Sequence, residues 1–218
     1  MKEFIRRVLS YAFPKLDRDF RAYRMLIRNR NSYLHTTGWM ESLLKQKPID
    51  CYGAPIPWMN LTVVALLKAR LTRDLTMFEY GSGYSTHFFA ARVKSIKSVE
   101  YDRHWQQLIG KDFPANGELI YIPQDVDGKY CRAVGGGNYD VIVIDGRDRV
   151  NCMKQSLSAL SPGGVIIFDD SHRTEYQGAF EDARAHGFKV MDIEGLKATG
   201  GTSYTTSLIY REQNCLGL

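Results

Sequence analysis

Acidic residues stand at or just after the ends of five short apolar segments in this chain of 218 residues. A carboxylate can accept hydrogen bonds from ribose hydroxyls, take up a proton from a reacting group, or bind a hard metal ion. Their recurrence at the same place in successive segments indicates one site assembled from several parts of the chain. The acids are Glu79, Glu100, Asp125, Asp145 and the pair Asp169-Asp170.

The sequence around the first acid reads Glu-Tyr-Gly-Ser-Gly-Tyr-Ser-Thr over 79–86 and runs into a helical pattern. Glycines at 81 and 83 allow the backbone to turn tightly and to approach a ligand closely. Ser85 or Thr86 can cap the helix that follows. Glu100 comes about 20 residues later, a spacing at which an acid can bind the ribose hydroxyls of a nucleotide. A glycine loop alone fits a structural turn equally well, so the prediction of a ligand site depends on the series of acids.

The elements that must position these acids are short strand patterns that alternate with helical patterns from residue 75 onward. This alternation predicts a parallel sheet with helices on both faces. The last two strand patterns, at 188–193 and 203–210, have no helix between them and should pair antiparallel. We therefore predict an α/β fold with a doubly wound, mostly parallel, seven-stranded sheet and an antiparallel last strand. The other strands are expected at 76–80, 98–101, 118–122, 139–144 and 164–168, and the helices among them at 86–93, 104–111, 151–160 and 175–186.

In an open parallel sheet, ligands bind beyond the carboxyl ends of the strands, where these acids should meet. With this arrangement, residues 75–210 resemble the class I S-adenosylmethionine-dependent methyltransferases, whose sheet is completed by such an antiparallel strand. The resemblance implies a Rossmann-like fold and S-adenosylmethionine as the cofactor. The third glycine of the dinucleotide fingerprint is missing, which disfavours NAD. The residues that the resemblance places at the cofactor are Glu79, Gly81, Gly83, Ser85, Glu100, Asp125 and Asp145.

Three of the acids also resemble the metal ligands of the magnesium-dependent O-methyltransferases, of both the catechol type and the macrocin/novobiocin sugar type. The resemblance implies that Asp145, Asp169 and Asp170 bind Mg²⁺. A hydroxyl bound to the ion would lose its proton more easily and become a nucleophile. In the alternative interpretation, Asp145 contacts the methionine amino group, and Asp169 and Asp170 cap the following helix.

The general base is not given by the resemblance. The catechol enzymes have a lysine where this chain has Asp148, and the sugar enzymes have an acid where it has Arg147. His172 lies two residues beyond the acid pair and can titrate near neutrality, so His172 and Asp145 are the predicted catalytic residues. A surface or capping histidine fits the sequence nearly as well.

The N-terminal part of the chain differs in charge from the rest. Residues 1–57 are predicted to form a helical, basic extension and lid, and residues 58–218 the cofactor-binding domain. Residues 1–30 contain nine basic and three acidic side chains, a net charge of +6. The apolar positions of residues 1–13 have the spacing of an amphipathic helix. Such a helix could lie on an anionic membrane, or pack against its own domain or a second subunit, and the oligomeric state stays open.

The composition and the local sequence limit the possible locations and partners of the protein. No apolar run approaches the roughly 18 residues of a membrane span. Four separated cysteines indicate reduced thiols, so we expect a cytoplasmic protein, with the inner face of the membrane as the alternative location. Asp145 is not followed by the prolines that accompany base methylation, which disfavours a nucleic-acid partner.

The predicted function is transfer of a methyl group from S-adenosylmethionine to a hydroxyl oxygen of a small molecule or saccharide, assisted by Mg²⁺. The alternatives are an RNA 2′-O-methyltransferase, a non-catalytic protein of the same fold, and an NAD-binding protein.

Overall fold

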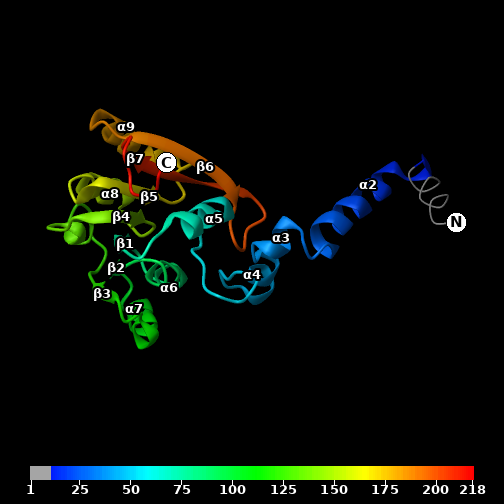
Figure 1. Ribbon diagram of the computed structural model, residues 1–218, viewed down its shortest axis with the longest axis horizontal. Coiled ribbons are helices and arrows are strands. Elements are labelled where there is room, and N and C mark those ends of the chain that lie inside the picture. Colours follow the sequence, from blue (N-terminus) through cyan, green and yellow to red (C-terminus); the bar gives the residue numbers. More distant parts are fainter. Residues whose placement is uncertain (1–10) are drawn as a thin grey trace.

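The computed structural model describes residues 11–218, which form a seven-stranded sheet with helices on both faces (Figure 1). The strand order is β3-β2-β1-β4-β5-β7-β6. The chain enters at the centre of the sheet, builds one half outward, and then returns to build the other half. The strands are β1 (Thr76–Tyr80), β2 (Ser95–Glu100), β3 (Gly117–Tyr121), β4 (Tyr139–Ile144), β5 (Leu160–Phe168), β6 (Lys189–Leu196) and β7 (Ser203–Tyr210).

The strand directions confirm the predicted fold. Strand β1 pairs in parallel with β2 and β4, and the pairs β2–β3 and β4–β5 are also parallel. Strand β7 runs antiparallel to both of its neighbours, β5 and β6. Two strands begin earlier than their apolar patterns suggested, β2 at Ser95 and β5 at Leu160. The carboxyl ends of β1 to β5 therefore share one edge of the sheet, as the positions of the acids predicted.

Alternating side chains of the central strands build a separate core on each face of the sheet. Val141 and Val143 of β4 contribute to the core under α5 (Leu61–Arg70) and α6 (Tyr84–Ala90), whereas Ile142 and Ile144 contribute to the core under α8 (Arg149–Leu157) and α9 (Gln177–Ala185). All four side chains are fully buried, which explains the continuous apolar run. Helix α7 (Arg103–Ile109) also belongs to this part of the chain.

The N-terminal segment extends away from the sheet as a series of short helices (Figure 1). Its first described helix, α2 (Pro14–Tyr23), has no buried residue. Pro14 stands in the first turn of α2, where its missing N–H costs nothing. The segment continues through the π-helix η1 (Arg24–Arg28) and the helices α3 (Tyr33–Thr36) and α4 (Trp39–Lys45).

The predicted membrane contact of residues 1–13 falls largely outside the described residues, which begin at residue 11. Within residues 11–218, no helix is both long enough and apolar enough to cross a membrane. The division at residue 57 stays a prediction. A hydrogen bond and apolar packing join the two predicted parts. The indole N–H of Trp39 donates to the carbonyl of Gly200, at 2.8 Å, in the connection between β6 and β7, and Ile56 belongs to the core on one face of the sheet.

Candidate functional site

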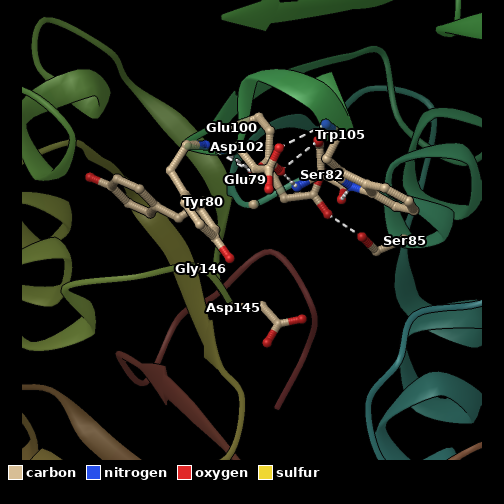
Figure 2. A pocket seen from close by; sticks show the side chains of 11 residues that line it. Glu79, Tyr80, Ser82, Ser85, Glu100, Asp102, Trp105, Asp145 and Gly146 are labelled. Carbon is tan, nitrogen blue, oxygen red and sulfur yellow. Dashed lines mark hydrogen bonds between the residues drawn. The ribbon is translucent and has the colours of Figure 1, made fainter. Parts of the chain in front are cut away.

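A cavity of about 380 Å³ lies at the carboxyl ends of β1, β2 and β4. This volume falls within the range of small-molecule and cofactor sites. Figure 2 shows Glu79, Ser82, Glu100 and Trp105 gathered at one side of the cavity, with Asp145 set apart from them. The lining residues are Glu79, Tyr80, Gly81, Ser82, Ser85, Glu100, Tyr101, Asp102, Trp105, Asp145 and Gly146.

The turn after β1 depends on glycine. Gly81 has a φ of +100°, a conformation that side-chain-bearing residues rarely adopt, and its N–H donates to the carbonyl of Val99 at 2.9 Å. The turn ends at Gly83, whose N–H donates to the hydroxyl of Thr86, at 3.0 Å, within the first turn of α6. Of the two predicted cap residues, Thr86 therefore makes the capping contact, whereas Ser85 donates its hydroxyl to Glu79. The loop therefore closes back onto the end of β1.

Glu79 is almost completely buried beneath this loop, at 1% exposure. Its carboxylate accepts hydrogen bonds from the hydroxyls of Thr86 at 2.7 Å and Ser98 at 2.9 Å, and from Ser85. Burial raises the pKa of Glu79 to about 7, although the three hydroxyl donors favour the ionised form. The group consequently titrates close to neutrality.

Glu100 joins the end of β2 to the same loop. One carboxylate oxygen accepts from the N–H and the hydroxyl of Ser82, at 3.1 and 2.9 Å. The other accepts from the N–H groups of Tyr101 and Asp102, both at 2.9 Å. The indole N–H of Trp105 donates to the carbonyl of Ser82 at 2.8 Å. The glycine loop and Glu100 thus meet at one rim, as the sequence predicted.

Six of the lining residues were not among the predicted site residues: Tyr80, Ser82, Tyr101, Asp102, Trp105 and Gly146. Four of the six directly flank predicted residues. The carboxylate of Asp102 caps α7 by accepting from the N–H of Trp105 at 2.9 Å. The cap pattern of Asp102 before a helix was a usable sequence signal. The position of Trp105 over the loop depends on how α7 packs, and no local pattern reveals it.

The charged side chains that line the cavity are all acidic. Its lining contains four carboxylic acids, Glu79, Glu100, Asp102 and Asp145, and no lysine, arginine or histidine. A low-dielectric cavity lined by one sign of charge favours ligands of the opposite sign. The site therefore suits a ligand that carries positive charge and hydrogen-bond donors.

The structure does not bring Asp125 to this cavity. Both of its carboxylate oxygens accept backbone hydrogen bonds within the following turn, from Lys129 at 2.6 Å and Tyr130 at 3.0 Å. Asp125 is thus engaged in local turn structure. The shared feature of standing after a strand does not distinguish a turn-forming aspartate from a ligand-binding one.

Asp145, at the end of β4, lines the cavity and keeps 30% of its side chain exposed. The guanidinium of Arg149 donates to its carboxylate at 3.0 Å. Burial, followed by the nearby charge of Asp169, raises the pKa of Asp145, and the charges of Arg149 and Lys197 oppose the shift. Asp145 is the one acid of the predicted metal set that faces the cavity.

Asp169 and Asp170, at the end of β5, are both bound by the ammonium group of Lys197. It donates to Asp169 at 2.8 Å and to Asp170 at 2.5 Å. Asp169 also accepts from the hydroxyl of Thr206 at 2.6 Å, and Asp170 accepts from Arg173 at 2.9 Å. Neither acid caps the next helix in the way the alternative interpretation expected, because both carboxylates are directed at side-chain donors.

This arrangement does not support the prediction of a magnesium site. Mg²⁺ requires carboxylate and water oxygens in near-octahedral geometry, whereas here the oxygens of Asp169 and Asp170 already accept from cationic side chains. Among residues 11–218, no group of three or more His, Cys, Asp or Glu side chains is arranged to hold a metal ion. The residues present do not fit the ion.

His172 faces a different cavity, of about 260 Å³, between α9 and the β6–β7 hairpin. Its ring lies edge-on to that of Tyr204, with centroids 5.8 Å apart. The structure thus separates His172 from the cavity that Asp145 lines, although both residues follow neighbouring strands. The side chains that line this second cavity with it are Ser171, Gln177, Phe180, Arg184, Asp192, Glu194 and Thr205.

Comparison with known proteins bears on the fold. No protein-family model matches the chain, and no curated protein matches it. The chain is similar to the crystal structure of a methyltransferase from Pyrococcus furiosus, with a TM-score of 0.53, 17% identity, and coverage of 80% of this chain and 94% of that one. It is also similar to precorrin-6y C5,15-methyltransferase from Geobacter metallireducens, with a TM-score of 0.51, 17% identity, and coverage of 70% and 88%. Together with the strand order and the antiparallel β7, these similarities show that the chain has a Rossmann-like methyltransferase fold.

Proposed function

We propose that this protein is an S-adenosylmethionine-dependent methyltransferase. The observation that carries the proposal is the acidic cavity in which the glycine loop after β1 and Glu100 after β2 converge. S-adenosylmethionine carries a sulfonium and an ammonium group, and its two ribose hydroxyls are hydrogen-bond donors. Each of these features is complementary to a cavity lined by four carboxylic acids and no basic side chain. The names of the two similar structures agree with this assignment.

The same charge pattern argues against the NAD alternative. The pyrophosphate of a dinucleotide carries two negative charges and is bound where backbone N–H groups or basic side chains are available. Here the N–H of Ser82 is already used by the carboxylate of Glu100. A pyrophosphate at this rim would meet that carboxylate at short range, which is destabilising.

The acceptor atom in this proposal is a hydroxyl oxygen of a small molecule or saccharide. The cofactor supplies a methyl group already activated by the sulfonium, so the protein must orient the acceptor and receive its proton. Asp145 is placed for that role because it lines the cofactor cavity and stays partly exposed. The proton passes from the acceptor oxygen to the Asp145 carboxylate, the oxygen bonds to the methyl carbon, and the carbon–sulfur electron pair remains on sulfur.

The test is calorimetric titration of the full-length protein with S-adenosylhomocysteine and, separately, with NADH. We expect saturable binding of S-adenosylhomocysteine and none of NADH. Glu100→Ala should weaken binding by about tenfold to a hundredfold, because charge-assisted hydrogen bonds to the rim are lost. Glu118→Ala is the matched control, since Glu118 is an exposed acid on the neighbouring strand β3 whose partner is Lys97. Binding of NADH in preference to S-adenosylhomocysteine would contradict the proposal.

A further inference from the structure

We propose that the ammonium group of Lys197 replaces the divalent cation at the ends of β4 and β5, so that this site works without a metal ion. The inference rests on the proposed function, because it concerns the acceptor side of the same site. It assigns Lys197 as the positioning residue for the acids that follow β5.

The first support is the position of the ammonium group. Lys197 lies directly after β6, yet its Nζ reaches Asp169 Oδ2 at 2.8 Å and Asp170 Oδ1 at 2.5 Å, bridging the two consecutive acids. The Lys197 side chain is 12% exposed, Asp170 is 9% exposed and Asp169 is fully buried. One cation thus bridges the two acids that the resemblance assigned to Mg²⁺.

The second support is the charge balance. The three carboxylates after β4 and β5 face three cationic side chains within 4 Å, so the cluster is neutral as it stands. A divalent ion added there would lie beside buried positive charge, which a low dielectric screens poorly. The pairs are Arg149 with Asp145 at 3.0 Å and with Asp170 at 3.9 Å, Arg173 with Asp170 at 2.9 Å, and Lys197 with Asp169 and Asp170.

The third support is the framework that holds Lys197 in place. Its backbone pairs with that of Asn60 in an antiparallel bridge. The amide of Asn60 donates to the hydroxyl of Thr206 at 2.9 Å, and this hydroxyl donates to Asp169 at 2.6 Å. The ammonium group also lies 4.8 Å from the ring centre of Tyr204. Because the same network fixes both the lysine and the acid, the ion pair is built into the fold.

The experiment measures Mn²⁺ binding to the full-length protein by electron paramagnetic resonance, with Mn²⁺ as the probe for a hard divalent ion. The wild-type protein should show no specific binding. Lys197→Met keeps the length of the side chain but removes its charge, leaving Asp169 and Asp170 with less compensation. We expect the Mn²⁺ affinity of this variant to rise by at least about tenfold, because the repulsive charge is gone. Specific binding by the wild type, or no gain in a folded Lys197→Met, would overturn the inference.

Two controls make the result specific. Lys189→Met removes an exposed lysine that pairs with Glu212, and it should leave Mn²⁺ binding unchanged. If Lys197→Met does not fold, as judged by circular dichroism, Lys197→Gln is measured in its place, since its amide can still donate to Asp169. S-adenosylhomocysteine binding is measured on the same samples. If the wild-type protein does not bind S-adenosylhomocysteine, the proposed function is contradicted. If the wild-type protein binds Mn²⁺ specifically, only the role of Lys197 is contradicted.

Discussion

Two regions of the same sheet edge differ in the groups that contact their acidic side chains. At the β1–β2 edge, formed by Glu79, Glu100 and the loop at 81–85, the carboxylates accept only from hydroxyl and backbone N–H groups. At the β4–β5 edge, formed by Asp145, Asp169 and Asp170, each carboxylate contacts a lysine or arginine. The first edge keeps net negative charge facing a cavity, and the second is neutral.

This difference shows why residue type alone does not define a site. A carboxylate supported only by neutral donors has no nearby cation to cancel its charge, so in its ionised form it can attract a cationic ligand. A carboxylate paired with a buried cation is already satisfied, and it serves to hold structure or to position a neighbour. The β1–β2 edge is therefore the region suited to the cofactor. At the β4–β5 edge only Asp145, which is partly exposed, faces the same cavity.

The largest expected effect on stability comes from removing one carboxylate charge from the ion pairs at the β4–β5 edge. Asp169→Asn leaves the Lys197 ammonium buried with one acid fewer, and it weakens the hydrogen bond from Thr206. Removing one member of a buried ion pair costs about 3–5 kcal/mol, so the free energy of unfolding should fall by about 3 kcal/mol, since Asp170 still pairs with Lys197. Urea denaturation at neutral pH measures the change.

The control for this substitution is Glu212→Gln, which disrupts the exposed pair with Lys189. Surface pairs of this kind contribute little to stability, so no measurable change is expected. Equal destabilisation by both substitutions would remove the distinction between a buried, structural ion pair and a surface one.

The protonation of Glu79 at the β1–β2 edge should make the stability of the protein depend on pH. Folding raises the pKa of Glu79 from 4.5 to about 7 through burial, so between these values the native state keeps a proton that the unfolded state has lost. The free energy of unfolding should therefore fall as pH rises across this window, by on the order of 3 kcal/mol.

Glu79→Gln isolates this contribution, because it cannot ionise and its amide oxygen can still accept from the neighbouring hydroxyls. The pH dependence between 4.5 and about 7 should become flatter in the variant. Urea denaturation at several pH values gives the comparison with the wild type. Parallel curves for the two proteins would show that Glu79 does not titrate in this range.

The smallest expected effect concerns the connection that carries Lys197. Trp39→Phe keeps most of the apolar ring but loses the N–H that donates to the Gly200 carbonyl. A single hydrogen bond of this kind contributes about 1 kcal/mol, so the loss of stability should be close to that value. Trp58→Phe, at a position 48% exposed, serves as the control and should have less effect. A larger loss from Trp58→Phe would argue against a specific contact between α4 and the β6–β7 connection.

Much of the fold and half of the site could be predicted from the sequence. The apolar runs of β4 and β5 and the missing helix between β6 and β7 predicted the parallel sheet and its antiparallel last strand. The glycine at position 81 predicted a turn, because only glycine adopts its φ of +100° at low cost. These features can be predicted from the sequence because backbone conformation and strand burial depend on residues that are adjacent in the chain.

The roles of the individual acids were decided only by the tertiary structure. Glu100 ends β2 and Asp125 follows β3, yet Asp125 closes its own turn whereas Glu100 contacts Ser82 of the glycine loop, 18 residues away. The sequence predicted Asp169 as a metal ligand, whereas in the structure its carboxylate accepts from Lys197, 28 residues further along the chain. A charge acts through space, so its partner can come from any segment that folding brings near. The sequence therefore determines which groups can ionise and where the backbone turns, whereas the folded arrangement determines which charges are cancelled and which remain for a ligand.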